Sequence, residues 1–266
     1  MSALTEKLDD IRAEGRSALI GYLPVGFPTV ERSVRAMETM IDAGVDIVEV
    51  GLPYSDPVMD GPTIQVAAER ALQGGTHIAD AFTAVRAVTA AGAPAVVMSY
   101  YNPMLQYGLE RFADDLVAAG GSGAITPDLT PDAAGMWLGA ARERNLDTIF
   151  LVAPSSTNER LHMTVAETTG FVYAASLMGV TGERASVGSG AESLVAATRA
   201  AGAERVCVGL GVSTGAQAAD VARFADGVIV GSALVRCLLD HEDERAALDA
   251  LRAKTVELAR GVRGEA

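Results

Sequence analysis

The residues best suited to acid–base chemistry are two carboxylates in the first quarter of the chain, Glu49 and Asp60. Glu49 lies in a short run of β-branched residues, 46–50, and side chains alternate between the two faces of a strand. If the flanking valines pack against helices, Glu49 points into the interior, where burial without a fixed cation raises its pKa. Such a carboxyl can both donate and accept a proton near neutral pH. The alternative is an ion pair with an arginine.

Asp60 lies in the segment that follows, residues 53–62, which is rich in proline and aspartate. Gly61 and Pro62 are typical of a helix start, because proline is favoured at the first helical position. Taken alone, this position favours a capping role for Asp60 over a catalytic one.

Glycines follow two apolar runs near the end of the chain and open helices there. Gly211 lies in Gly209-Leu-Gly-Val-Ser213, and Gly231 precedes Ser232. Either pair alone can simply permit a tight turn. Together, after the seventh and eighth strands of a barrel, they favour a phosphate site built from backbone N–H groups and helix N-termini. Thr181 and Gly182 are candidates for a third contact.

These residues need a scaffold that brings the ends of several strands together. Eight runs rich in β-branched residues alternate with longer Ala-, Arg- and Glu-rich segments, which is typical of βαβ units on a parallel sheet. The expected strands are 18–22, 46–50, 95–99, 123–126, 148–152, 171–175, 205–209 and 227–230. The expected helices between them are 29–43, 63–73, 78–91, 108–119, 131–143, 157–167, 190–201 and 214–223, with one more near 3–14 and a last one at 242–262.

This order favours the α/β class and a (β/α)8 TIM barrel with an extra N-terminal helix over an open doubly wound sheet. The segment after the first strand, 22–28, lacks the glycine pattern of a dinucleotide fold. The chain has 266 residues, and barrels of about 250 residues form one unit, so we expect a single domain over residues 1–266.

The net charge of −13 would repel a phosphate backbone, so nucleic acid is not an expected partner. No apolar run reaches the roughly 18 residues of a membrane span, and the first ten residues carry charges where a signal peptide is apolar. We therefore expect a cytoplasmic protein without membrane contact.

Metal and Schiff-base chemistry find little support in the residue types. The three histidines are scattered, and Cys207 and Cys237 lie in apolar stretches typical of buried thiols. The only two lysines, Lys7 and Lys254, lie in the expected terminal helices. We expect no metal and no cofactor.

The segment Glu49-Val-Gly-Leu-Pro-Tyr-Ser-Asp-Pro-Val-Met-Asp-Gly-Pro-Thr-Ile-Gln65 resembles the signature of the tryptophan synthase alpha subunit family. The resemblance continues through Tyr101-Asn-Pro103, Pro127-Asp-Leu129, Gly179-Val-Thr-Gly182 and Gly209-Leu-Gly-Val-Ser213, in family order over nearly the whole chain. Leu177, Met178 and Leu210 depart from common family residues, which bears on the shape of the indole pocket.

The resemblance implies a lyase that splits indole-3-glycerol phosphate into indole and glyceraldehyde 3-phosphate in tryptophan biosynthesis. Glu49 matches the family's catalytic acid/base, and Asp60 matches the carboxylate that holds the indole ring nitrogen. Tyr173 matches a tyrosine lining the active site. The phosphate-binding positions fall on Gly182, Gly211, Gly231 and Ser232, with Thr181 beside them.

The resemblance also implies a pyridoxal-phosphate beta subunit that receives indole directly in an α2β2 complex. Its docking surface should be the carboxyl-end face of the barrel, where Asp56, Pro57, Asn102 and Pro103 lie in loops rich in Pro, Tyr and Asp. Such loops can also be merely rigid turns.

Two other readings share the expected phosphate site. One is a phosphosugar isomerase or epimerase, which usually needs a base pair or a metal that the sequence does not offer. The other is a non-catalytic subunit that binds a phosphorylated ligand, against which the intact Glu49 and Asp60 argue.

Overall fold

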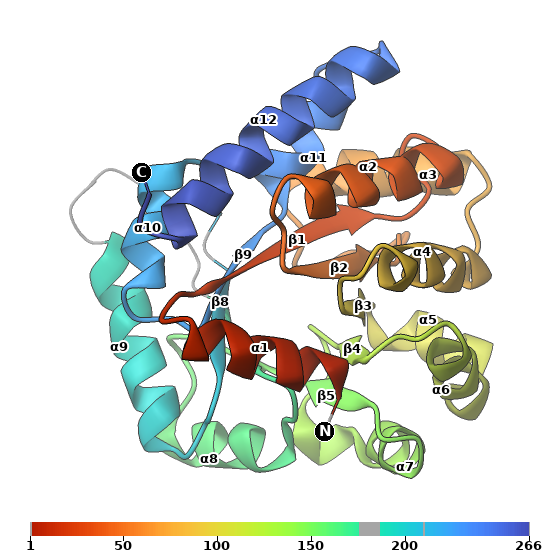
Figure 1. The fold of residues 1–266 in the computed structure, drawn as a ribbon. Helices are drawn as coiled ribbons and strands as arrows, with labels where there is room; N and C mark the ends of the chain where they lie inside the picture. Colours follow the sequence, from red (N-terminus) through yellow and green to blue (C-terminus); the bar gives the residue numbers. More distant parts are fainter. Residues whose placement is uncertain (1, 176–186, 210, 266) are drawn as a thin grey trace.

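The computed structural model describes residues 2–175, 187–209 and 211–265, and its centre is a parallel sheet of nine strands (Figure 1). Neighbouring strands follow the order β5-β4-β3-β2-β1-β9-β8-β7-β6. The strands are β1 (Ala18–Pro24), β2 (Ile47–Gly51), β3 (Ala95–Met98), β4 (Gly123–Ile125), β5 (Asp147–Ile149), β6 (Leu151–Val152), β7 (Val172–Ala175), β8 (Val206–Gly209) and β9 (Gly227–Val230).

The expected fifth strand, 148–152, is divided at Phe150 into two strands, and this division closes the barrel. β5 pairs with β4, whereas β6 pairs with β7. The backbone N–H of Tyr173 donates to the carbonyl of Phe150 at 3.0 Å. The run 147–152 therefore pairs with β4 before Phe150 and with β7 from Phe150 onward. The (β/α)8 TIM barrel is therefore confirmed, and the sequence-based count of eight strands differs only at this division.

Helices surround the barrel in the order expected (Figure 1). They are α1 (Ala3–Ala13), α2 (Val30–Asp42), α3 (Pro62–Gln73), α4 (Ile78–Ala90), α5 (Tyr101–Tyr107), α6 (Leu109–Ala118), η1 (Pro131–Ala133), α7 (Gly135–Glu143), α8 (Asn158–Glu167), α9 (Val187–Ala200), α10 (Gly215–Ala222), α11 (Ser232–Leu239) and α12 (Glu244–Val262). Asn102 and Pro103 were expected in a loop, which is wrong, because α5 occupies these positions. Pro103 fits there since it lies in the first turn, where backbone N–H groups have no helical partner.

The apolar residues form two clusters that follow the alternation of each strand. Ile47 belongs to the inner cluster, whereas Val48 and Val50 belong to the outer one, which packs against the helices. Glu49 therefore faces inward, as its position in the strand predicts.

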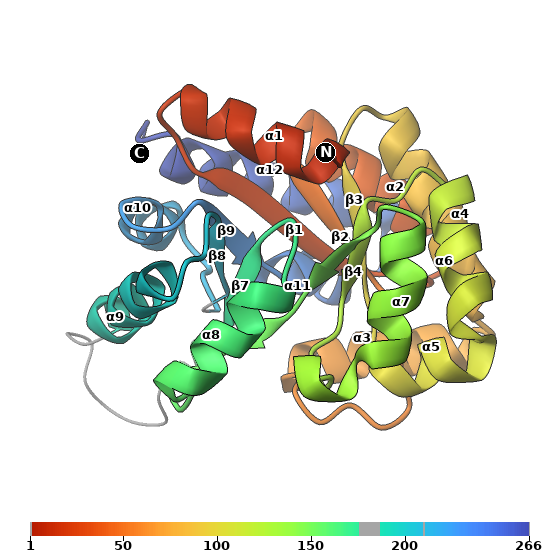
Figure 2. The same cartoon turned by 90° about the horizontal axis from the view of Figure 1, so that it is seen from below.

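The extra N-terminal helix α1 covers the end of the barrel where the strands begin. Its Leu4, Leu8 and Ile11 complete the inner cluster. In Figure 1 α1 lies in front of the strands, and in Figure 2 it lies above them, while the loop between β2 and α3 lies at the opposite end.

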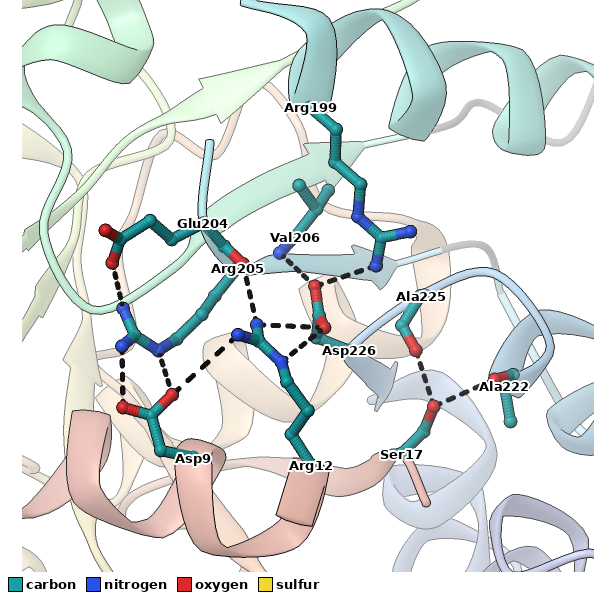
Figure 3. Close-up of polar contacts among 10 residues, drawn as sticks. All are labelled: Asp9, Arg12, Ser17, Arg199, Glu204, Arg205, Val206, Ala222, Ala225 and Asp226. Carbon is teal, nitrogen blue, oxygen red and sulfur yellow. Dashed lines mark hydrogen bonds and ion pairs between the residues drawn. The ribbon is translucent and has the colours of Figure 1, made fainter. Parts of the chain in front are cut away.

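Ion pairs between α1 and residues just before β8 and β9 stabilise α1 in this position (Figure 3). Arg205, just before β8, donates to both carboxylate oxygens of Asp9 at 2.8 and 2.7 Å. Arg12 donates to Asp226 at 3.0 Å, and Asp226 also accepts from Arg199 and from the backbone N–H of Val206. Helix α1 thus covers the end of the barrel where the strands begin, and the carboxyl ends of the strands, where barrel enzymes place their active sites, lie opposite it.

Among the described helices, none is long and apolar enough to cross a lipid bilayer.

Candidate active site

A cavity of about 240 Å³ lies at the carboxyl ends of the strands, opposite α1. It brings together six residues that the sequence analysis selected. They are Glu49, Asp60, Tyr173, Gly211, Gly231 and Ser232. Thr181, Gly182, Leu177, Met178 and Leu210 lie outside the described residues.

Glu49 is fully buried at the inner face of β2, and it has no ionic partner among the described residues. Neither carboxyl oxygen has a hydrogen-bond partner in that part of the chain. Burial raises the pKa of Glu49 to about 8. The alternative of an ion pair with an arginine is not what the described residues show, and the group can exchange a proton near neutral pH.

Two tyrosines line the same cavity as Glu49, one from the adjacent strand and one from a strand further round the barrel. Tyr22 of β1 is the register partner of Glu49, and Tyr173 comes from β7. A Cβ atom at Gly51 would overlap the Tyr22 phenol, and one at Gly209 would overlap the Tyr173 phenol. Each ring therefore leans over a glycine of the adjacent strand, toward the carboxyl end.

Burial raises the pKa of both Tyr22 and Tyr173 well above that of a free phenol, and the nearby carboxylates of Asp60 and Glu49 add to the effect. Both hydroxyls are therefore neutral at physiological pH. Tyr22 was not among the predicted site residues, although its alternation with Ile20 along β1 indicates that it faces inward.

Asp60 is half-buried at the rim of the same cavity. Helix α3 begins after Gly61, the N-cap residue, and no side chain caps it. The capping role that the sequence favoured for Asp60 is therefore wrong. Burial raises the pKa of Asp60, and a hydrogen bond from the Tyr100 side chain partly offsets this rise.

The glycine segments after β8 and β9 form the other side of the cavity. Gly211 has φ of +67°, a conformation that favours glycine. Gly231 is the N-cap residue of α11, and Ser232 is the first residue of that helix. The N-terminal N–H groups of a helix lack helical partners, so this edge of the cavity suits an anion.

Neither lysine lines this cavity. Lys7 lies in α1, and Lys254 lies in α12, where its ammonium group pairs with Glu257 at 2.7 Å. Within residues 2–175, 187–209 and 211–265, no group of three or more His, Cys, Asp or Glu side chains is arranged to hold a metal ion.

The residues expected at a partner surface have mixed exposure. Asp56 and Asn102 are exposed and Pro57 is half-buried, but Pro103 is buried. The expectation that Pro103 contributes to an exposed surface is therefore wrong, because α5 turns this side chain inward. Exposed apolar side chains lie on neighbouring elements instead, with Val58 78%, Met59 51%, Leu105 42% and Met136 64% accessible.

Comparisons with known proteins agree on one family. A model described as tryptophan synthase alpha chain matches residues 8–263. The chain is 59% identical over 262 residues to the tryptophan synthase alpha chain of Mycobacterium marinum, covering 98% of this chain and 95% of the relative. It is 55% identical to that of Thermobifida fusca, with 100% of both chains covered.

Solved structures give the same result. The aminoacrylate-bound form of tryptophan synthase from M. tuberculosis contains a chain with a TM-score of 0.90 and 54% identity, covering 99% of this chain and 100% of that one. A tryptophan synthase alpha chain from Legionella pneumophila has a TM-score of 0.89 at 30% identity, covering 99% and 98%. The chain therefore belongs to the tryptophan synthase alpha chain family and is an enzyme of tryptophan biosynthesis.

Proposed function

We propose that the cavity cleaves indole-3-glycerol phosphate into indole and glyceraldehyde 3-phosphate by acid–base catalysis at Glu49. The observation that carries this proposal is a fully buried carboxyl without an ionic partner among the described residues, in one cavity with Asp60 and two glycine-rich segments. Family membership supports the same reaction.

Glu49 performs the two proton transfers. In its neutral form it donates a proton to C3 of the indole ring, which makes the ring cationic. The resulting carboxylate then accepts the proton of the side-chain hydroxyl next to the ring. As that hydroxyl becomes an aldehyde, the bond between C3 and the side chain breaks and its electrons neutralise the ring. A pKa of about 8 suits both directions of transfer.

Asp60 stabilises the cationic ring. Ionised and next to the ring N–H, it compensates the positive charge that develops after C3 is protonated. A carboxylate already in place needs no reorganisation at that moment, which makes its stabilisation larger than in water. The indole ring is its own electron sink, so the step requires neither a Schiff-base lysine nor a metal.

The phosphate group of the substrate binds at Gly211, Gly231 and Ser232, with Thr181 and Gly182 as further candidates. Binding of this remote group aligns the scissile bond between the two carboxylates. Tyr173 lines the wall beside Glu49.

We also propose that the chain docks a beta subunit in an α2β2 complex that passes indole on directly. The solved relatives from M. tuberculosis are whole tryptophan synthases by name. The loop after β2 and helix α5 lie next to each other at the cavity end of the barrel (Figure 2), and they carry the exposed Asp56 and Asn102. The exposed Val58, Met59, Leu105 and Met136 add apolar surface suited to an interface core.

The function is tested by following indole release from indole-3-glycerol phosphate in the presence of a chelator. We expect turnover that the chelator does not change. Turnover that disappears with chelation would instead indicate a metal-dependent barrel enzyme. Binding without turnover, even with beta subunit added, would indicate a non-catalytic subunit.

A further inference from the structure

The hydroxyl group of Tyr100 lies beneath the segment that carries Asp60. Tyr100 lies two residues after the end of β3 and is buried, with 5% of its surface accessible. Its hydroxyl accepts a hydrogen bond from the backbone N–H of Met59 at 3.0 Å. The neighbouring residue in the loop is Asp60, and Tyr100 lowers the pKa of its carboxyl. One phenol thus holds the loop backbone next to the functional side chain and favours the ionised form of that side chain.

The ring of Tyr100 is fixed from two sides. Its backbone is the N-cap of α5, so its direction follows from the start of that helix. The ring of Tyr54, from the loop after β2, packs on it with 5.2 Å between centroids and an angle of 34°. The Tyr54 hydroxyl in turn accepts from the side-chain amide of Asn102 at 3.3 Å. Tyr100 is therefore a rigid support rather than a side chain free to turn.

No basic side chain among the described residues stabilises the Asp60 carboxylate, so a rigid neighbour matters for this side chain. The described titratable groups that face Asp60 are three phenols, and Glu49 of β2 lies in the same cavity. The phenols belong to Tyr100 at the start of α5, Tyr22 of β1 and Tyr173 of β7. No described arginine or lysine contributes to the pKa of Asp60. Burial favours the neutral form of Asp60, and the hydrogen bond from Tyr100 is the one described contribution that favours the carboxylate.

We propose that Tyr100 is a positioning residue, whose hydroxyl holds the loop backbone at Met59 and so keeps the adjacent Asp60 side chain directed at the ring nitrogen of the substrate. This inference rests on the proposed lyase function for the role of Asp60. Tyr100 itself exchanges no proton with the substrate.

The test compares Tyr100→Phe with wild type and with Tyr107→Phe as a matched control. Tyr107→Phe also removes a phenol hydroxyl, but this hydroxyl lies outside the cavity and donates to Asp115 at 2.6 Å. In Tyr100→Phe we expect kcat to fall by about 10- to 100-fold with little change in KM, because a misplaced group costs rate rather than substrate affinity. In the dependence of kcat on pH, the acidic limb should move to higher pH. Loss of the Tyr100 hydroxyl raises the pKa of Asp60, which must be ionised for catalysis. Tyr107→Phe should match wild type in both respects.

A double-mutant cycle shows whether Tyr100 acts through Asp60. In an Asp60→Asn background, Tyr100→Phe should cost less than about twofold further in kcat. The same loss in both backgrounds, or a kcat for Tyr100→Phe within twofold of wild type, would overturn the proposal.

A readout without substrate separates this inference from the proposed function. The carboxyl ¹³C shift of Asp60, titrated in the substrate-free protein, should give a higher pKa in Tyr100→Phe than in wild type and in Tyr107→Phe. An unchanged Asp60 titration contradicts the positioning role even if wild-type protein releases no indole. Absence of indole release by wild type, with a shifted titration, contradicts the lyase function and leaves Tyr100 as the support of Asp60.

Discussion

Tyr22 and Glu49 are register partners on adjacent parallel strands, and both side chains face the interior at one level of the barrel. The Tyr22 phenol leans over Gly51 and so lies on the side of Glu49 that opens toward Asp60. A neutral phenol thus lies beside Glu49, and burial is the one contribution among the described residues that raises its pKa.

Asp60→Asn should lower kcat and kcat/KM together while KM changes little. The charge of Asp60 matters chiefly when the ring becomes cationic, and an interaction made only in the transition state affects both constants equally. We expect a loss of at least about 10²-fold, as for removal of one preorganised group. Steady-state kinetics measure this. A rise in KM alone would show that Asp60 is only a ground-state contact.

Glu49→Gln should stabilise the fold, and increasingly so as pH rises. The pKa of Glu49 is raised from 4.5 to about 8 in the folded state, so the folded protein binds the proton more tightly than the unfolded chain does. Stability due to this group is complete below pH 4.5 and is lost as pH rises through about 8. Gln has no such loss, so the difference in unfolding free energy should grow to the order of a few kcal/mol above pH 8. Denaturant titrations at pH 5 and pH 9 measure it, and equal differences at both would contradict a buried neutral Glu49.

Gly51→Ala should destabilise the fold and impair turnover. The new Cβ would overlap the Tyr22 phenol, and overpacking of this kind costs about 1–3 kcal/mol. Gly139→Ala in α7 is the control, because no atom lies within 4 Å of its Cβ position and alanine is the better helix former. In thermal unfolding, Tm should fall for Gly51→Ala and rise slightly for Gly139→Ala relative to wild type. A Gly51→Ala protein as stable as wild type would mean that Tyr22 can move freely.

We expect the docked beta subunit to raise the lyase rate of this chain, and Leu105→Asp should weaken this activation without changing the basal lyase rate. Leu105 is 42% exposed on α5, and burying a charge in an interface core is costly. Val117→Asp is the control, since Val117 is 45% exposed near the end of α6, away from the cavity end of the barrel. Asp56→Ala should act in the same direction as Leu105→Asp. The lyase rate of each variant is measured as a function of beta subunit concentration. Equal activation of Leu105→Asp and Val117→Asp would exclude α5 from the interface.

Alternation within a single strand was enough to predict the inward side chain of Glu49, because it depends only on local geometry. The order of strands and helices predicted the barrel for a similar reason. The glycines after β8 and β9 were predicted to gather on one side because parallel strands end at one face.

Features that depend on tertiary contacts could not be predicted in this way. Residues 101–107 look like a turn because they contain Asn102 and Pro103, and only packing against the barrel makes them a helix. The role of Tyr100 depends on a loop that folds back over it from β2, and nothing in the spacing of the two segments indicates that contact. The expected cap at Asp60 is wrong because Gly61, which lies between Asp60 and the helix, is the N-cap residue and no side chain caps the helix.

The most direct test of the central claim is the lyase turnover of Glu49→Gln, measured as indole release at saturating substrate. Gln keeps the volume and polarity of Glu but cannot exchange a proton at neutral pH. The account predicts a loss of at least about 10²- to 10⁴-fold with substrate binding and folding retained. Turnover within about tenfold of wild type would contradict Glu49 as the group that moves the protons.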